Sequence, residues 1–267
     1  MRLRSLLYVP ADNPRFLARA QARGADALIL DLEDGVAEAH KDVARGALAG
    51  AIPRLNGARV FVRVNATPDR RADDIAAAMA SGAYGIVLPK VGSPDDIAGA
   101  GLRVIALIED PAALSRAEAI ARHPAVIAMA LGSEDFATAI GARPTPEVLR
   151  LPMQLVHYAA KSAGRLSLGL FRSIADMAAD SAILAAATEA RSFGFDGAAC
   201  IHPAAVPPLN RGFSPGADEV AEARAILAAF ALGGAVRLGT RMIDKPIADR
   251  ARRTLWLAGE GEDSTAA

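Results

Sequence analysis

The stretch Ala27-Leu28-Ile29-Leu30-Asp31-Leu32-Glu33-Asp34-Gly35 is an apolar run of strand length that ends in acidic residues and a glycine. Residues 60–65, 104–111 and 126–135 repeat the arrangement, because each begins with apolar residues and ends in charged or polar ones. Strands that are covered on both faces in a parallel sheet have this composition. When parallel strands close into a barrel, their carboxyl ends meet at one mouth, where TIM barrels carry out their chemistry. We therefore expect the polar run-ends to gather at such a mouth.

Eight apolar runs alternate with alanine-rich segments that favour helices. This alternation predicts right-handed parallel crossovers, and eight units favour a closed barrel over an open doubly wound sheet. The first run is not followed by a glycine-rich dinucleotide motif, which also disfavours the open sheet. The predicted fold class is α/β, a TIM (β/α)8 barrel with a short C-terminal helical extension. The predicted strands are residues 5–9, 27–32, 60–64, 85–90, 104–108, 126–131, 166–170 and 197–201, and the predicted barrel helices are residues 13–23, 38–51, 69–81, 112–122, 146–163 and 176–193.

The alternation stops after the eighth run. A proline-rich loop leads into a predicted helix at 217–232, Gly233-Gly234 interrupts the chain, and a last basic helix is expected to begin near Pro246. We assign residues 1–212 to the catalytic barrel and residues 213–258 to a C-terminal extension that is expected to contact a neighbouring subunit. Residues 259–267 are small and polar, which predicts a disordered tail.

The composition limits the possible partners and the cellular location. Lys and Arg together number 30, as do Asp and Glu, so no global charge indicates nucleic acid or a membrane surface as a partner. Cys200 is the sole cysteine, which excludes an internal disulfide and suits a reducing compartment. The N-terminal apolar stretch at 6–9 is too short for a signal peptide, and no run reaches transmembrane length. These features predict a soluble cytoplasmic protein.

Glu109 and Asp135 end consecutive apolar runs. Two carboxylates from neighbouring strands could bind Mg²⁺, a hard cation that takes oxygen ligands and keeps waters for a substrate to displace. The alternative is a helix N-cap for Asp135 and a solvated loop position for Glu109. Charged residues at the ends of two other runs favour the metal site.

Arg63 interrupts an apolar run, an unusual place for a charge unless it points into the barrel mouth. There its guanidinium could grip a carboxylate through two hydrogen bonds. The alternative is a structural ion pair with Asp31 or Glu33. Because side chains alternate along a strand, Asp31, Glu33 and Asp34 are not expected to serve one site. We interpret Asp31 as pointing inward, as a structural residue or one that orients the arginine, and the other two as holding metal-bound waters.

Three further polar residues end or follow runs. Lys90 could neutralise substrate charge, or it could cap a helix or form an ion pair. His202 is predicted to be a hydrogen-bonded structural residue, and Cys200 is predicted to pack in the core.

Several motifs, in order from Arg4 to about Arg253, resemble the citrate lyase β-subunit-like family of the HpcH/HpaI aldolase superfamily, which includes the malyl-CoA and citramalyl-CoA lyases. They are Arg4-Ser-Leu-Leu-Tyr-Val-Pro-Ala, Gly24-Ala-Asp-Ala-Leu-Ile-Leu-Asp-Leu-Glu-Asp-Gly, Val62-Arg-Val-Asn, Val87-Leu-Pro-Lys, Gly132-Ser-Glu-Asp, Gly194-Phe-Asp-Gly-Ala-Ala-Cys-Ile-His-Pro and Arg241-Met-Ile-Asp-Lys-Pro.

The resemblance implies a TIM barrel, usually trimeric, that uses Mg²⁺ to make or break a carbon–carbon bond in a 3-hydroxyacyl-CoA thioester, giving acetyl-CoA and an oxo-acid. Glu109 and Asp135 match the metal ligands of the family, and Arg63 matches the arginine that holds the oxo-acid. Glu33 and Asp34 match an acidic pair near the metal.

The resemblance also implies roles for residues that the pattern alone does not single out. Asp244 matches an aspartate that relatives deliver from a neighbouring subunit, and it is the candidate for proton transfer to the enolate carbon. Together with Arg63, the segment Gly132, Ser133 and Glu134 is expected to hold the substrate through its backbone N–H groups.

Two departures from the family pattern lie near the expected mouth. Asp110 follows Glu109 where the family has Thr or Ser, and Leu168 stands where an aspartate often occurs, so the acyl and thioester preferences stay open. Two other functions also stay open: a lyase subunit acting on an acyl-carrier-protein thioester, and a non-catalytic barrel with a regulatory role.

Overall fold

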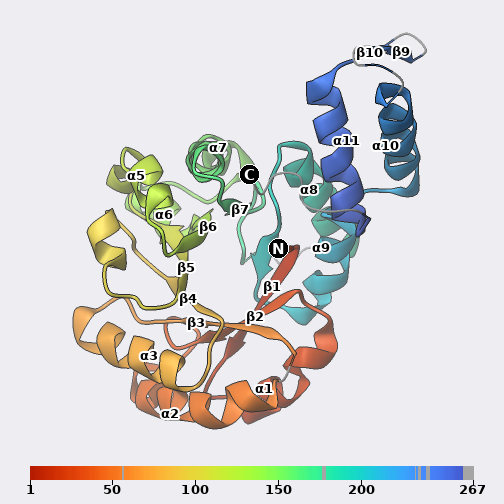
Figure 1. Ribbon diagram of the computed structural model, residues 1–267. Helices are drawn as coiled ribbons and strands as arrows, with labels where there is room; N and C mark the ends of the chain where they lie inside the picture. Colours follow the sequence, from red (N-terminus) through yellow and green to blue (C-terminus); the bar gives the residue numbers. More distant parts are fainter. Residues whose placement is uncertain (56, 176–178, 232, 234–235, 239–240, 261–267) are drawn as a thin grey trace. The chain divides into compact units, whose positions relative to one another are not determined.

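A parallel barrel forms the larger part of the molecule (Figure 1). The computed structural model describes residues 1–55, 57–175, 179–231, 233, 236–238 and 241–260. Within them the barrel strands are β1 (Ser5–Pro10), β2 (Ala27–Asp31), β3 (Arg59–Arg63), β4 (Gly85–Leu88), β5 (Arg103–Ile108), β6 (Val126–Leu131), β7 (Leu166–Leu168) and β8 (Ala198–Cys200). They pair in parallel in the order β7-β6-β5-β4-β3-β2-β1-β8.

The two ends of this order meet, so the sheet closes. Leu168 bridges to Gly197 in parallel, and the Asp196 N–H donates to the Ser167 carbonyl at 2.9 Å. The predicted TIM barrel is confirmed, and the predicted strands lie within two residues of their observed bounds. β7 and β8 are shorter than expected, because their mutual pairing is limited to this narrow contact.

Helices and short 3-10 turns connect the strands. The helices are α1 (Pro14–Ala20), α2 (Lys41–Ala51), α3 (Pro68–Ala80), α4 (Pro111–Leu114), α5 (Ala117–Arg122), α6 (Ser133–Ala139), α7 (Pro146–Ser162), α8 (Asp180–Ser192) and α9 (Val206–Gly212). The 3-10 turns are η1 (Gln21–Arg23), η2 (Glu38–His40), η3 (Ile52–Arg54), η4 (Pro94–Ile97) and η5 (Pro203–Ala205). The single helix predicted at 112–122 is two helices, and α6 and α9 were not predicted.

Strand alternation separates two apolar layers. On β2, Leu28 and Leu30 belong to the large cluster of buried residues that includes residues of α2, whereas Ile29 belongs to a separate cluster with Phe61 and Leu107. That second cluster fills the barrel interior. A side chain two residues after one of these interior residues therefore also faces inward, and it lies nearer the carboxyl end of its strand.

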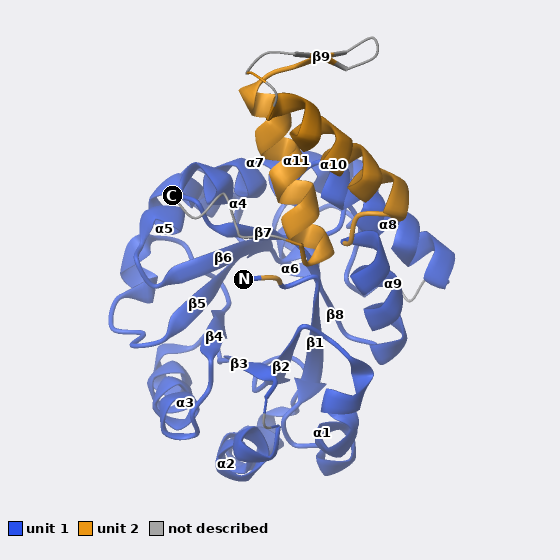
Figure 2. Cartoon of the chain, turned by 45° about the vertical axis from the view of Figure 1, so that its right-hand side comes forward, with its two compact units in different colours: residues 1, 3–213 blue, residues 2, 214–267 orange. Residues whose placement is uncertain are grey.

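The chain divides into two compact units, coloured separately in Figure 2: residues 3–213 with Met1, and residues 214–267 with Arg2. The second unit contains α10 (Ala217–Phe230), the hairpin β9 (Val236–Leu238) and β10 (Arg241–Ile243), and α11 (Lys245–Ala258). Its own buried cluster consists of Ala223, Ile226, Ile243 and Ala251.

Two predictions concern the end of this unit and the membrane. Of the tail predicted at 259–267, residues 261–267 lie outside the described residues. Gly259 caps α11 with φ 90°, and the Glu260 carboxylate pairs with Arg224 at 2.7 Å. Among the described helices, none combines the length and the apolar character needed to cross a membrane.

Candidate functional site

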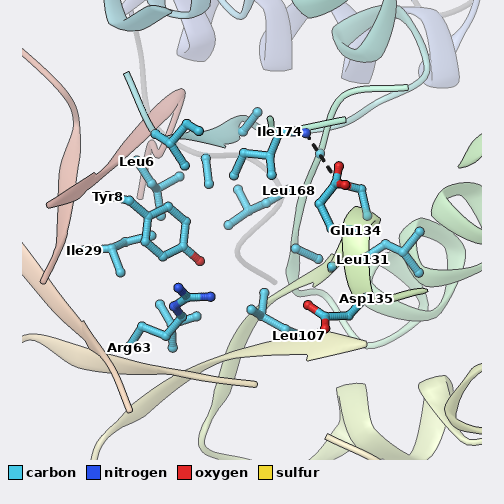
Figure 3. A pocket seen from close by; sticks show the side chains of 18 of the residues that line it. Leu6, Tyr8, Ile29, Arg63, Leu107, Leu131, Glu134, Asp135, Leu168 and Ile174 are labelled. Carbon is cyan, nitrogen blue, oxygen red and sulfur yellow. Dashed lines mark hydrogen bonds between the residues drawn. The ribbon is translucent and has the colours of Figure 1, made fainter. Parts of the chain in front are cut away.

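The carboxyl ends of the strands surround a cavity of about 420 Å³ (Figure 3). Tyr8, Asp31, Arg63 and Glu109 line it. Each lies two residues beyond an apolar residue that also faces the barrel interior, so strand alternation brings these four polar side chains to the mouth. The predicted inward direction of Asp31 and Arg63 is confirmed by their place in this lining.

Three carboxylates contact Arg63. Asp31 accepts hydrogen bonds from its Nε at 2.7 Å and from its Nη2 at 2.6 Å, which is a bidentate pair. Arg63 Nη1 lies 3.1 Å from a carboxylate oxygen of Glu33 and 3.1 Å from one of Asp34. The expectation that these three acids could not serve one site is wrong, since all of them contact the same guanidinium.

The reason lies in the turn that follows β2. Asp31 Oδ1 accepts a hydrogen bond from the Glu33 N–H at 3.0 Å, and its Oδ2 accepts one from the Gly35 N–H at 2.9 Å. Strand alternation ends where the chain folds over the Asp31 side chain, so Glu33 and Asp34 turn back towards Arg63. A Cβ on Gly35 would collide with the Asp31 carboxylate, so the turn requires glycine.

Tyr8 is a lining residue that the sequence analysis missed. The Arg63 guanidinium carbon lies 5.0 Å from the centre of its ring, a cation–π distance. Burial raises the pKa of the Tyr8 hydroxyl above its ordinary value. The sequence did contain a signal for this position: Tyr8 lies two residues after the apolar Leu6, so strand alternation places both side chains on the same face of the strand.

Glu109 is held in place at the end of β5. It is buried, and its Oε2 accepts a hydrogen bond from the Lys90 backbone N–H at 2.8 Å. Lys90 has φ 53°, which aims this N–H at the carboxylate, whereas its own side chain is exposed. The proposed alternative of a solvated loop position for Glu109 is therefore wrong, and the contribution of Lys90 to the site comes from its backbone.

Asp135 lies in the first turn of α6, and its carboxylate points into the pocket (Figure 3). The N-cap of α6 is Gly132, so the N-cap alternative for Asp135 is wrong. Gly132 also lies against Glu109, because a Cβ built on this glycine would be 2.5 Å from Glu109 Cγ. A side chain at 132 would thus displace one of the two predicted metal ligands.

The electrostatics of these carboxylates suit a cation. Burial raises the pKa of Glu109 to about 7, and the charge of Asp135 adds to the effect. Burial likewise raises the pKa of Glu33 to about 7, with Asp34 contributing. A cation placed between Glu109 and Asp135 would relieve their repulsion, and carboxylate oxygens are the ligands that Mg²⁺ takes. Within the described residues, no group of three or more His, Cys, Asp or Glu side chains is placed to hold a metal, so the fit rests on these two.

The start of α6 and the loop after β7 form another wall. Gly132, Ser133 and Glu134, the segment predicted to bind the substrate, line the cavity. The Ser133 hydroxyl oxygen accepts a hydrogen bond from the Ile174 N–H at 3.4 Å, and the Glu134 carboxylate accepts one from the Ser173 hydroxyl. These bonds tie the two segments together beside Asp135.

A buried network behind the mouth was also missed. The Lys41 ammonium donates to the Glu33 carbonyl at 3.3 Å and to the Asn65 side chain. Asn65 in turn donates to Asp74 through its backbone N–H at 2.9 Å and its side-chain N–H at 2.7 Å. Asp74 is fully buried and also accepts from Arg45 Nε at 2.7 Å. The network links the loop after β2, which carries Glu33, to the loop after β3, which directly follows Arg63.

The remaining candidates have local structural contacts. Asp110 caps α4 by accepting a hydrogen bond from the Ala112 N–H at 2.7 Å, which explains an acid at this position. His202 caps η5 through the Ala204 N–H at 3.2 Å, so its predicted structural role is confirmed. Asp244 belongs to the second unit, where it caps α11 by accepting from the Ile247 N–H at 3.2 Å.

The chain is thus a TIM barrel with an acidic cavity at the carboxyl ends of its strands, which is the position of the active site in TIM-barrel enzymes. The family model for HpcH/HpaI aldolase/citrate lyase matches residues 4–203. A citrate lyase subunit beta-like protein of Mycobacterium tuberculosis is 35% identical over 267 residues, covering 95% of each chain. A (3S)-malyl-CoA thioesterase of Cereibacter sphaeroides is 33% identical, covering 94% of this chain and 93% of the relative.

The solved structures include CitE of Mycobacterium tuberculosis in complex with magnesium, acetoacetate and coenzyme A. It is 32% identical to this chain, has a TM-score of 0.84, and covers 96% of this chain and 98% of its own. This chain therefore belongs to the HpcH/HpaI aldolase/citrate lyase family.

Proposed function

We propose that this protein is a Mg²⁺-dependent carbon–carbon lyase that cleaves or forms a 3-hydroxyacyl-CoA thioester, such as malyl-CoA or citramalyl-CoA, to give acetyl-CoA and an oxo-acid. The observation that carries the proposal is the pair Glu109 and Asp135, which share one cavity with Arg63. The relatives named for citrate lyase subunit beta, and CitE with magnesium, acetoacetate and coenzyme A, support it.

Glu109 and Asp135 would hold the metal in this proposal. Bound there, Mg²⁺ would supply Lewis acidity towards the substrate oxygens and fix their orientation. The Lys90 N–H and the closeness of Gly132 keep the Glu109 carboxylate in one position, so this ligand is preorganised.

Arg63 would hold the oxo-acid carboxylate. A guanidinium has five N–H donors. Asp31 takes one from Nε and one from Nη2, which fixes the plane of the group. Asp34 is largely exposed, so an incoming carboxylate could displace it from Nη1 at little cost. The N–H groups of Ser133 and Glu134 would complete the substrate contacts.

Two acids are assigned to proton transfer. Glu33 is buried with a pKa near 7, so at neutral pH it can accept the proton of the substrate hydroxyl as the carbon–carbon bond breaks. The electron pair of that bond passes to the acetyl thioester as its enolate. Asp244 would then deliver a proton to the enolate carbon, from a neighbouring subunit of a trimer. The trimer and the extension at 213–258 as its contact are parts of the proposal.

Hydrolysis of the thioester is the second candidate, because relatives named (3S)-malyl-CoA thioesterase match over nearly the whole chain. A buried carboxylate with a pKa near 7, such as Glu33, could also activate water. The acyl-carrier-protein thioester is a third substrate form, supported by the relatives named citrate lyase subunit beta. The proposal includes a cytoplasmic location, because Cys200 is a free, buried thiol, which suits a reducing compartment. Burial raises the pKa of this thiol to about 12.

The test incubates the purified protein with Mg²⁺ and either malyl-CoA or citramalyl-CoA and identifies the products by mass spectrometry. A lyase releases acetyl-CoA with glyoxylate or pyruvate, whereas a thioesterase releases free CoA with malate or citramalate. Glu109→Gln should abolish the Mg²⁺-dependent reaction. Asp110→Asn is the matched control, because asparagine preserves the cap of α4 and the carboxylate next to Glu109 is removed. Full activity of Glu109→Gln, or in the presence of a chelator, would refute the metal assignment.

A further inference from the structure

The walls of the cavity differ from one side of the barrel to the other. Charged residues come from β2, from β3 and from just beyond the end of β5: Asp31, Arg63 and Glu109. On the opposite side, the described residues of β6, β7 and β8 themselves contribute only apolar side chains to the cavity, namely Ala130, Leu131, Leu168, Ala198 and Ala199, and charged lining residues occur only beyond the strand ends, as Glu134 and Asp135 in α6 and Arg172 after β7. Figure 3 shows Leu168 facing the cavity across from Arg63.

On the apolar side of the cavity, two small side chains leave open space beside them, and a third, larger side chain is buried. Ala130 and Ala199 are only partly buried, because their methyl groups border open cavity space. Leu168 is buried, with 4% of its surface exposed, and joins the interior cluster with Leu6 and Ile29. The cavity thus has an apolar recess next to its charged half.

Ala130, Leu168 and Ala199 offer no hydrogen-bond donor to a second substrate carboxylate. The donors of Arg63 already face three carboxylates, and Glu109, Glu134 and Asp135 add further negative charge to the lining. A carboxylate set against these three side chains would lose water without gaining a donor from them, which is costly. Arg172, which lines the same cavity from the loop after β7, is the other cationic side chain of the lining besides Arg63.

We infer that the recess formed by Ala130, Leu168 and Ala199 receives an alkyl substituent of the oxo-acid. The substrate would then be a 2-oxo monocarboxylic acid that carries an alkyl group, in preference to glyoxylate, which has none, and to a dicarboxylic oxo-acid such as oxaloacetate. The inference rests on the proposed function, since it names the substrate class of the same site.

The expected order of affinity follows from burial. Each methylene moved from water into an apolar recess strengthens binding about fourfold. Pyruvate should therefore bind about fourfold more tightly than glyoxylate, and 2-oxobutyrate about fourfold more tightly again. Oxaloacetate should bind about tenfold more weakly than 2-oxobutyrate or worse, because its second carboxylate would be desolvated.

The experiment is isothermal titration calorimetry of the full chain with saturating Mg²⁺ against these four oxo-acids. Ala199→Val should remove the preference for the larger alkyl groups while glyoxylate binding stays as in the wild type. Ala130→Val is the second variant, and thermal unfolding of both variants shows that they are folded. Equal affinity for all four acids, no binding of any of them, or an unchanged order in both folded variants would overturn the inference.

Tightest binding of oxaloacetate would also overturn it. Arg172 lines the same cavity from the loop after β7, so Arg172→Ala would then show whether that side chain reads the second carboxylate. Turnover of the corresponding acyl-CoA thioesters is measured separately. Binding in the expected order without carbon–carbon cleavage would refute the proposed function and support the recess, whereas cleavage without alkyl preference would do the reverse.

Discussion

Replacing Gly132 by alanine places a methyl group against the proposed metal ligand Glu109. The new Cβ would lie 2.5 Å from Glu109 Cγ, 2.6 Å from Oε1 and 2.9 Å from Cδ. The backbone of Gly132, at φ −77° and ψ 98°, is open to alanine, so the perturbation acts through this contact and not through backbone strain.

The collision can be relieved in two ways, and each has an expected size. If Glu109 stays in place, overpacking should lower the free energy of unfolding by about 1–3 kcal/mol. If Glu109 moves, it gives up the hydrogen bond from the Lys90 N–H, and the loss of a bond to a charged group costs about 1.5–3 kcal/mol. If Glu109 stays, the start of α6 must shift and carries Asp135 with it, so in either case one of the two ligands is displaced and Mg²⁺ affinity should fall about 10–100-fold.

The assay is a calorimetric Mg²⁺ titration together with thermal unfolding of the metal-free protein. Gly46→Ala is the matched control: Gly46 lies in α2, is exposed, and has no atom within 4 Å of a built Cβ. It should leave Mg²⁺ affinity unchanged and raise stability by about 0.5–1 kcal/mol. Wild-type Mg²⁺ affinity and stability in Gly132→Ala would refute the packing of Gly132 against a metal ligand.

Four further outcomes are expected. Arg63→Lys keeps the charge but loses the planar fork, so calorimetry should show oxo-acid affinity reduced about tenfold or more with Mg²⁺ binding retained; unchanged oxo-acid affinity would leave Arg63 a structural ion-pair residue. Burial raises the pKa of Glu109 from 4.5 to about 7, so the folded state favours its protonated form. The free energy of unfolding of the metal-free protein therefore holds the full contribution of Glu109 below pH 4.5 and loses it as the pH rises through 7. Mg²⁺ needs the ionised form, so it should raise the unfolding temperature more at pH 8 than at pH 6, and equal increases would contradict this. Asp74→Asn should lower the free energy of unfolding by about 3 kcal/mol in denaturant titrations, whereas the exposed neighbour control Asp73→Asn should change it little, and similar values for the two would count against the buried network. Mixed oligomers of Asp244→Ala and Arg63→Ala chains should regain activity, since some sites then hold both residues; mixed oligomers without any recovery would show that Asp244 does not act across subunits.

The barrel was predictable because its signals are local. The run at 27–31 is apolar at each position before its acid, and such runs recur between helical segments, so strand positions and parallel order follow from composition and chain length. Alternation along the strand predicted that Asp31 points into the mouth, and a charge within an apolar run predicted the same for Arg63. The two metal-ligand candidates were located from the ends of the apolar runs, since Glu109 directly follows β5 and Asp135 lies just beyond β6.

Other features of the site depend on contacts between segments that are distant in sequence. Strand alternation predicted that Glu33 and Asp34 diverge, but the Asp31 side chain accepts the N–H groups of the next turn and brings both back to Arg63. A departure at Asp110 that looked functional proves to be a helix cap.

The sequence by itself determined the (β/α)8 barrel, its family and the acids and arginine at the strand ends, because periodicity and short motifs are encoded within single strands. The tertiary structure alone decided which carboxylates share Arg63, how the Lys90 N–H and Gly132 confine Glu109, and that Leu168 faces an apolar recess. These are properties of a closed cavity, in which the position of each side chain depends on atoms of neighbouring strands and loops.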